Sequence, residues 1–279
     1  MAGALVMMLS GCVDMTTVTT GSAQPSTTVT PTSTLPPVVD CPGSGEFEEG
    51  GGIADIDGSG SDSARLGRIS WDATDRCETF TFEFETSEGA PATALPDIEV
   101  EHLDSFQVIR VRVGVDMSVI TDQQVESDFV DRLYVVRSLD GAMFVDLHLS
   151  APAAVRVTAL DSPARLGLEL RPGFVAFTGV SPSADDVVLV SPVPDADVAT
   201  TLELAGYTRT PDSDVLVVVT QAGSLVSETT TAAATSTDVW GEFGTELTVP
   251  PGNVSVFVGE ESPDDGSLLG LTIDVNVSQ

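Results

Sequence analysis

Residues 79–84 read Thr79-Phe80-Thr81-Phe82-Glu83-Phe84, and this stretch decides the fold class. Polar and large apolar side chains alternate through it, with the period of two that is typical of a β-strand buried on one face. The alternation returns within residues 106–113, and residues 133–136 form another short apolar run. Because no segment has the spacing of a convincing amphipathic helix, the sequence predicts an all-β protein.

Two domains are expected from the length of 279 residues, at roughly 150 residues per domain. In the first half, Asp140-Gly141 separates two apolar runs, which is a strong hairpin signal. Beyond a connection at residues 173–186, about seven short apolar runs follow in residues 187–277, a spacing that fits an immunoglobulin-like sandwich. We therefore expect β-sandwich-like domains at residues 63–173 and 186–278.

Charge excludes several classes of partner. The chain has 43 acidic and 11 basic residues, every basic residue is Arg, and the formal net charge is −32. Such a field repels nucleic acid and disfavours adsorption to anionic lipid headgroups. Any attachment to a membrane must therefore come from something other than a basic patch.

The amino terminus supplies such an attachment. The apolar run at residues 2–9 is too short to cross a membrane, which takes about 20 residues, and it predicts a signal segment. Leu9-Ser10-Gly11-Cys12 resembles the lipobox of bacterial lipoproteins, although no basic residue precedes the run. The resemblance implies lipidation of Cys12 and anchoring at the extracytoplasmic face of the cell membrane. Residues 1–12 are thus expected to form the signal segment with its lipobox.

A disordered stalk is expected at residues 13–62. Sixteen of the 27 residues from 13 to 39 are Thr, Ser or Pro, and the sequence then turns acidic and rich in Gly. With Cys12 lipidated, only Cys41 and Cys77 remain. An oxidising compartment outside the cytoplasm favours their pairing, so a Cys41–Cys77 disulfide is expected.

Two family resemblances follow. Arg68, Asp75-Arg76 before the strand at 79–84, and the closing run at residues 163–170 resemble actinobacterial AMIN-like domains, although Cys77 stands where an aliphatic residue is usual. AMIN domains place cell-wall amidases and secretion machinery at peptidoglycan, so the resemblance implies a similar role.

The second resemblance covers residues 186–278. Its residues are Ser191-Pro192, Gly206, Trp240-Gly241-Glu242-Phe243 and the run at 262–267. They resemble the immunoglobulin-like domain first described from bacterial spore-germination proteins, the second of the Gmad families.

These features together predict a non-catalytic binding or assembly module of the cell envelope. Its partner is expected to be peptidoglycan or an envelope protein. Arg68, Trp71 and Arg76 are the candidate binding residues, because Arg can pair with a carboxylate while an indole face stacks on a sugar ring. Arg68, Asp75 and Arg76 can instead form a structural ion pair, and a Trp in a β-sandwich can fill the core.

The alternative is an envelope hydrolase with an unrecognised site around His102 or His148, both in strands beside carboxylates. No nucleophile elbow, zinc motif or phosphate loop appears. Residues 55–60 resemble the start of a calcium loop, but Leu66 stands where a bidentate Glu is needed. No metal or cofactor is therefore expected.

Overall fold

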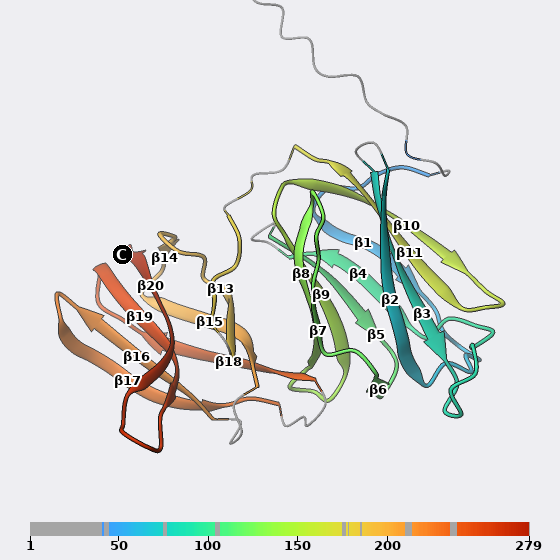
Figure 1. Cartoon of the computed structure of the whole chain (residues 1–279). Helices are drawn as coiled ribbons and strands as arrows, with labels where there is room; N and C mark the ends of the chain where they lie inside the picture. Colours follow the sequence, from blue (N-terminus) through green and yellow to red (C-terminus); the bar gives the residue numbers. More distant parts are fainter. Residues whose placement is uncertain are drawn as a thin grey trace, which may run out of the picture. The chain divides into compact units, whose positions relative to one another are not determined.

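The computed structural model of the chain describes most of the residues from Cys41 onward. These are residues 41, 45–74, 77–103, 107–174, 177, 179–184, 186–209, 214–234 and 239–278. Their regular structure consists of β-strands arranged in three sheets (Figure 1). In this part of the chain, no helix has the length and apolarity that a membrane span requires.

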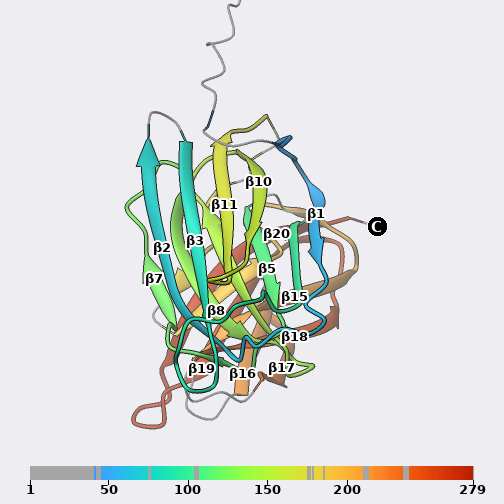
Figure 2. The same cartoon turned by 90° about the vertical axis from the view of Figure 1, so that its right-hand side faces the viewer.

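The first domain is a sandwich of two sheets. One sheet has the strand order β10-β11-β3-β2-β6, and β10, β11, β3 and β2 lie side by side in Figure 2. Its strands are β10 (Ala153–Leu160), β11 (Arg165–Pro172), β3 (Cys77–Glu85), β2 (Arg65–Thr74) and β6 (Met117–Ser118).

The facing layer of the first domain has the order β1-β4-β5-β9-β8, with β7 paired to β8. Its strands are β1 (Gly51–Ile56), β4 (Ile98–His102), β5 (Val108–Val113), β9 (Met143–Leu149), β8 (Val130–Arg137) and β7 (Asp122–Gln124).

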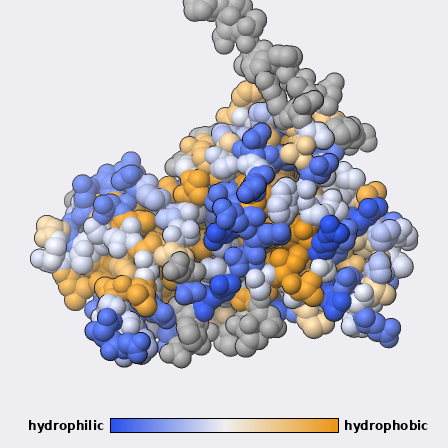
Figure 3. All heavy atoms as spheres, in the orientation of Figure 1, coloured by the Kyte–Doolittle hydropathy of each residue, from blue (hydrophilic) through white to orange (hydrophobic). Residues whose placement is uncertain are grey.

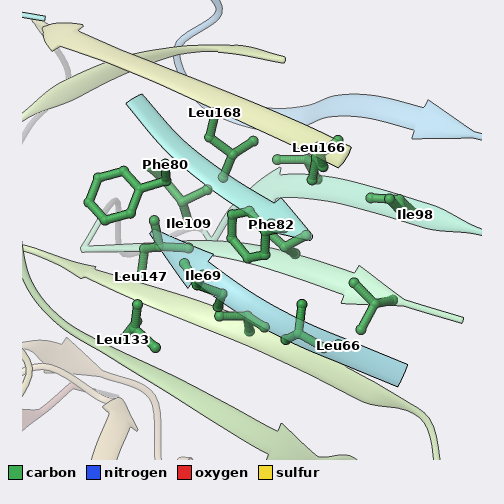
Figure 4. Packing of buried hydrophobic residues seen from close by; sticks show 14 of the residues in the cluster. Leu66, Ile69, Phe80, Phe82, Ile98, Ile109, Leu133, Leu147, Leu166 and Leu168 are labelled. Carbon is green, nitrogen blue, oxygen red and sulfur yellow. The ribbon is translucent and has the colours of Figure 1, made fainter. Parts of the chain in front are cut away.

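Alternation along β3 builds the core between these two layers. Phe80, Phe82 and Phe84 are buried, whereas Thr81 and Glu83 between them are partly exposed on the other face. The buried side chains of the two sheets pack against one another, as Phe82 and Leu166 do from one layer and Ile109 from the other (Figure 4). The period of two in the sequence therefore becomes the inner and outer faces of one sheet.

The second domain is also a two-layer sandwich. One layer has the order β18-β15-β13-β12 and the other the order β14-β20-β19-β16-β17. The first layer contains β18 (Trp240–Thr248), β15 (Thr201–Thr208), β13 (Val187–Ser191) and β12 (Ser183–Ala184). The second contains β14 (Asp197–Val198), β20 (Leu268–Val277), β19 (Gly252–Glu261), β16 (Asp214–Gln221) and β17 (Ser224–Ala232).

One sheet continues from the first sandwich into the second. β18 pairs in parallel with β8, with Trp240 opposite Val136 and Gly241 opposite Arg137. The two domains therefore share a ten-stranded sheet and belong to one compact unit that begins at Val39. Sequence reasoning did not predict this sharing.

The predicted all-β fold is confirmed, and each of the seven apolar runs of the second domain is a strand. Asp140-Gly141 lies in the turn between β8 and β9, where Gly141 has a φ of 90°. The expected stalk at 13–62 is wrong at its end, because Gly51–Ile56 forms β1 against β4. The Gly-rich, acidic composition of this segment does not predict a strand, and the strand is stabilised by its pairing with β4. Residues 13–40 and the signal segment lie outside the described residues.

Candidate functional site

The three predicted binding residues do not form one patch. Trp71 pairs with Phe80 across β2 and β3, and their rings stack with centroids 6.4 Å apart. Trp71 is therefore partly buried against the core. Arg68 is exposed on the opposite face of β2, as expected for residues an odd number of positions apart in a strand. Arg76 lies outside the described residues.

Arg68 belongs instead to what we call the polar sheet face, the outer face of β10, β11, β3 and β2. The register puts Glu83 between Arg68 and Arg165 in one row. The adjacent row consists of small or hydroxyl-bearing residues: Ser70, Thr81, Gly167 and Thr158. Among the described residues, Nε of Arg165 has no hydrogen-bond partner. This face combines guanidinium groups with hydroxyls on a regular strand spacing.

Cys41 and Cys77 are joined by a disulfide in this structure, with their Cα atoms 5.6 Å apart. Cys12 lies outside the described residues. The disulfide fastens the end of the N-terminal segment to the first residue of β3. Arg156 adds to this attachment, because its guanidinium donates to the carbonyl oxygens of Cys41 and Gly45, each at 3.4 Å.

The N-terminal strap, residues 45–50, then crosses β10. The ring of Phe47 lies 4.5 Å from the guanidinium carbon of Arg156 and 4.2 Å from that of Arg171. Glu48 and Val155 exchange two backbone hydrogen bonds, of 2.8 and 2.9 Å. Contacts to several elements therefore hold the place where the chain enters the first domain.

His102 has a structural environment. Its side chain is buried on β4, and Nδ1 accepts a hydrogen bond of 3.0 Å from the backbone N–H of Gly50 in the strap. Burial lowers the pKa of His102, and the charge of Glu49 opposes that shift only in part. The ring therefore helps to hold the strap on the sheet and is withdrawn from solvent.

His148 lies in a buried polar network between the two domains. Asp146 is fully buried and accepts hydrogen bonds of 2.9 and 2.7 Å from Nε and a terminal nitrogen of Arg110. Tyr207 of the second domain donates its hydroxyl proton to the same carboxylate. Nε2 of His148 lies 3.3 Å from the Tyr207 oxygen. The carboxylate of Asp146 is thus hydrogen-bonded to Arg110 and Tyr207.

Electrostatics in this network follow from burial and pairing. Burial lowers the pKa of His148 to about 4, with the charge of Asp146 opposing the shift and those of Arg110 and Arg132 adding to it. Burial and the charge of Asp146 together raise the pKa of Tyr207 well above its ordinary value. Near neutral pH the imidazole and the phenol are therefore both uncharged. Because the His148 ring is buried, it is poorly placed to reach a substrate, and its lowered pKa makes it a weak base.

Glu242 of β18 connects the second domain to the β8–β9 turn. Its Oε2 accepts hydrogen bonds from the hydroxyl of Ser138 at 2.7 Å and from the backbone N–H of Leu139 at 3.1 Å. Its Oε1 lies 3.7 Å from Arg110. Trp240, two residues earlier, is buried edge-on against Tyr134, with ring centroids 5.1 Å apart.

The residues Trp240-Gly241-Glu242-Phe243 thus contribute to the contact between the domains, and the sandwich around them is an immunoglobulin-like arrangement of two layers. Residues 186–267 match the Gmad2 family, described as an immunoglobulin-like domain of bacterial spore germination. This segment is therefore similar to Gmad2 domains, and we call the sandwich that contains it the Gmad2 domain. No curated protein matches the chain significantly.

In this chain, the Trp240–Glu242 segment of the Gmad2 domain contacts the domain that precedes it. Beside the contact lies a pocket of about 220 Å³, lined by Leu103, Val190 and Ala205 together with Arg110, Tyr207 and Glu242. Within the described part of the chain, no His, Cys, Asp or Glu residues are grouped as they would be to hold a metal ion.

Sequence reasoning missed Arg110, Asp146, Tyr207 and Glu242. A partial signal was present in the sequence of β9, where Asp146 and His148 interrupt an otherwise apolar run, and the structure shows that every residue from Met143 to Leu149 is buried. A strand that is apolar on one face and carries Phe, Asp and His on the other, with both faces buried, indicates cover on both sides. The outer cover of β9 is the Gmad2 domain, whose Tyr207 and Trp240 pack there.

The first prediction concerns the disulfide. Replacing both Cys41 and Cys77 by Ala is expected to lower the free energy of unfolding by about 3 to 4 kcal/mol, because the bond closes a loop with a sequence separation of 36. Urea titration of the wild-type protein with reductant should reproduce the result for the double variant. Finding two free thiols in unfolded, unreduced wild-type protein would contradict the bond.

The second prediction concerns Asp146. Asp146→Ala leaves the buried Arg110 without its partner, so we expect a loss of about 3 to 5 kcal/mol in urea unfolding followed by Trp fluorescence. Asp72→Ala, at an exposed carboxylate, is the matched control and should change little. Combining Arg110→Met with Asp146→Leu should recover part of the loss. Equal stabilities of the Asp146 and Asp72 variants would show that the pair does not hold the junction.

The third prediction is a pH dependence. An unfolded His titrates near pH 6.5, whereas His148 in the folded protein titrates at about 4. Between these values the unfolded chain binds a proton that the folded chain does not, so stability falls as the pH drops from 6.5 to 4. The contribution is on the order of 3 kcal/mol. His148→Gln should flatten this part of the stability curve, and an unchanged slope would refute the assignment.

Proposed function

We propose that this chain is an extracytoplasmic lipoprotein whose two β domains act as a non-catalytic binding or assembly module of the cell envelope. The observation that carries this proposal is that both candidate catalytic histidines make structural contacts. His102 and His148 are both buried, and each is engaged with a neighbouring structural element. The hydrolase alternative therefore has no support from either histidine.

Three further features support the envelope assignment. The Gmad2 match names an immunoglobulin-like domain of spore germination. A disulfide is typical of a protein that folds outside the cytoplasm. The Leu9-Ser10-Gly11-Cys12 segment resembles a lipobox, which would supply a lipid anchor at Cys12.

The polar sheet face is the surface we assign to peptidoglycan. Hydroxyls of Ser70, Thr81 and Thr158 offer hydrogen bonds to sugars, and Arg68 can pair with a carboxylate of a peptide stem. Trp71 has no part in this surface, because it faces the core. The negative charge of the whole molecule opposes an anionic polymer, so binding is expected to be weak and to improve at moderate salt.

The fourth prediction tests the anchor. Cys12→Ala should move the protein from the membrane fraction to the soluble fraction, because the apolar run at residues 2–9 is too short to hold it in a bilayer. Cys41→Ala is the matched control and should leave the protein with the membranes. Fractionation followed by immunoblotting reads the outcome. Retention of the Cys12 variant in the membrane fraction would disprove lipid anchoring at this residue.

The fifth prediction tests the ligand. The unlipidated protein should sediment with isolated peptidoglycan at about 0.3 M salt, where long-range repulsion is screened, without releasing any hydrolysis product. Arg68→Ala should reduce the sedimented fraction. Arg112→Ala, which removes the same charge from the opposite layer of the first domain, should not. If the wild-type protein stays in the supernatant at every salt concentration, an envelope protein becomes the partner to seek.

A further inference from the structure

The outer face of the β17-β16-β19-β20 layer of the Gmad2 domain is apolar at its centre. Along β16, the buried Val215, Val217 and Val219 alternate with side chains that point to the other side of the sheet. Two of these outward residues are Leu216 and Val218, where a strand facing water usually carries polar groups. Each is only partly exposed, because its neighbours on the same face lie beside it.

Phe257 extends this apolar centre. The register puts it opposite Val218 of β16 and Thr272 of β20. A Cβ atom at Gly259 would lie 2.7 Å from the tip of the Phe257 ring, so the ring reaches along the strand over that glycine. Gly270 is paired with Gly259 and has a φ of 157°. The absence of side chains at both glycines leaves the ring uncovered from that direction.

Two exposed leucines continue the apolar strip at its ends. Leu225 of β17 is 62% exposed and pairs with Thr220. Leu268 of β20 is 51% exposed and pairs with Glu261. In Figure 3, hydrophobic residues are visible at the part of the molecule occupied by β16 and β17. We call this surface the apolar sheet face; its members are Leu216, Val218, Leu225, Phe257 and Leu268.

Carboxylates surround this face, and the described residues of β16, β17, β19 and β20 include no cation. Glu228 pairs with Val218 from β17, Glu261 and Asp274 lie on β19 and β20, and all three are exposed. From residue 210 to the end, the sequence contains no Lys, Arg or His. A surface that docks here must therefore bring its own positive charge.

We propose that the apolar sheet face docks a partner protein through a surface with an apolar centre and a rim of Lys or Arg. Burial of apolar area supplies the affinity, and the acidic rim selects a partner surface with positive charge. A second copy of this chain is disfavoured, because it would bring the same net charge of −32. An anionic polymer or lipid surface is disfavoured for the same reason. The inference deepens the proposed assembly role, but it uses a surface distinct from the polar sheet face.

The test uses the full chain carrying Cys12→Ala and a fluorescent synthetic peptide of alternating Arg and Leu. Two comparison peptides alternate Arg with Ser and Glu with Leu. Anisotropy titrations should give saturable binding of the Arg–Leu peptide and much weaker binding of the other two. Raising salt from about 50 to 300 mM should weaken the Arg–Leu complex, because the rim charges become screened.

Variants locate the binding. The first variant combines Val218→Thr with Leu225→Thr, because Thr is β-branched and is well tolerated in strands. It should weaken the Arg–Leu complex about tenfold, since less apolar area is buried on binding. Val119→Thr combined with Leu160→Thr is the matched control, because it alters one Val and one Leu exposed on the first domain. Unchanged thermal unfolding of both variants shows that folding is preserved.

Three outcomes would overturn the inference. If both double variants bind the Arg–Leu peptide with the same affinity, the peptide binds at another surface. If the Arg–Ser peptide binds as tightly as the Arg–Leu peptide, charge alone explains the binding. Self-association of the chain that Val218→Thr abolishes would make a second copy the occupant. Neither membrane fractionation nor peptidoglycan sedimentation enters this test, so its failure is distinguishable from failure of the lipoprotein proposal.

Discussion

The fold of the described residues depends on the neutralisation of Asp146. A carboxylate with no exposed surface is tolerated in a protein only when it is paired and hydrogen-bonded. Arg110 supplies the charge from the neighbouring strand, and Tyr207 supplies a further hydrogen bond from the Gmad2 domain. Because one partner comes from each domain, the outer face of the first domain is completed only when the second is in place.

The arginines show how a chain with so few cations uses them. Arg110 and Arg156 are buried and paired with Asp146 and Glu169, and Arg209 pairs with Asp122 across the two domains. These three arginines thus serve interior and junction contacts. The acidic majority remains on the surface, which keeps the protein soluble and repels anionic partners.

Local pattern was enough to predict the strands and the turn at Asp140-Gly141, because alternation and turn chemistry are properties of short segments. It failed for Gly51–Ile56, whose glycines and acids carry no strand signal and whose order comes from pairing with β4. It also failed for the junction. The contact between Asp146 and Tyr207 joins residues 61 positions apart, and nothing near either residue specifies the other.

The predicted grouping of Arg68 and Trp71 on one binding surface failed for a related reason. Arg68 and Trp71 are close in sequence, but a strand directs residues three positions apart to opposite faces. The pairing of Trp71 with Phe80 then directs the indole to the core. Proximity in the chain is therefore a poor guide to shared surfaces in an all-β protein, and cross-strand register is the better one.

Register also explains how two domains that share one sheet offer two different surfaces. In the first domain it aligns guanidinium and hydroxyl groups on the outer face of β2, β3 and β11. In the Gmad2 domain it aligns Val218 with Phe257 and surrounds them with carboxylates. The first of these faces suits a ligand with hydroxyl and carboxylate groups, and the second suits a surface that is apolar and positively charged. The difference arises because cross-strand register, and not proximity along the chain, decides which side chains share a face.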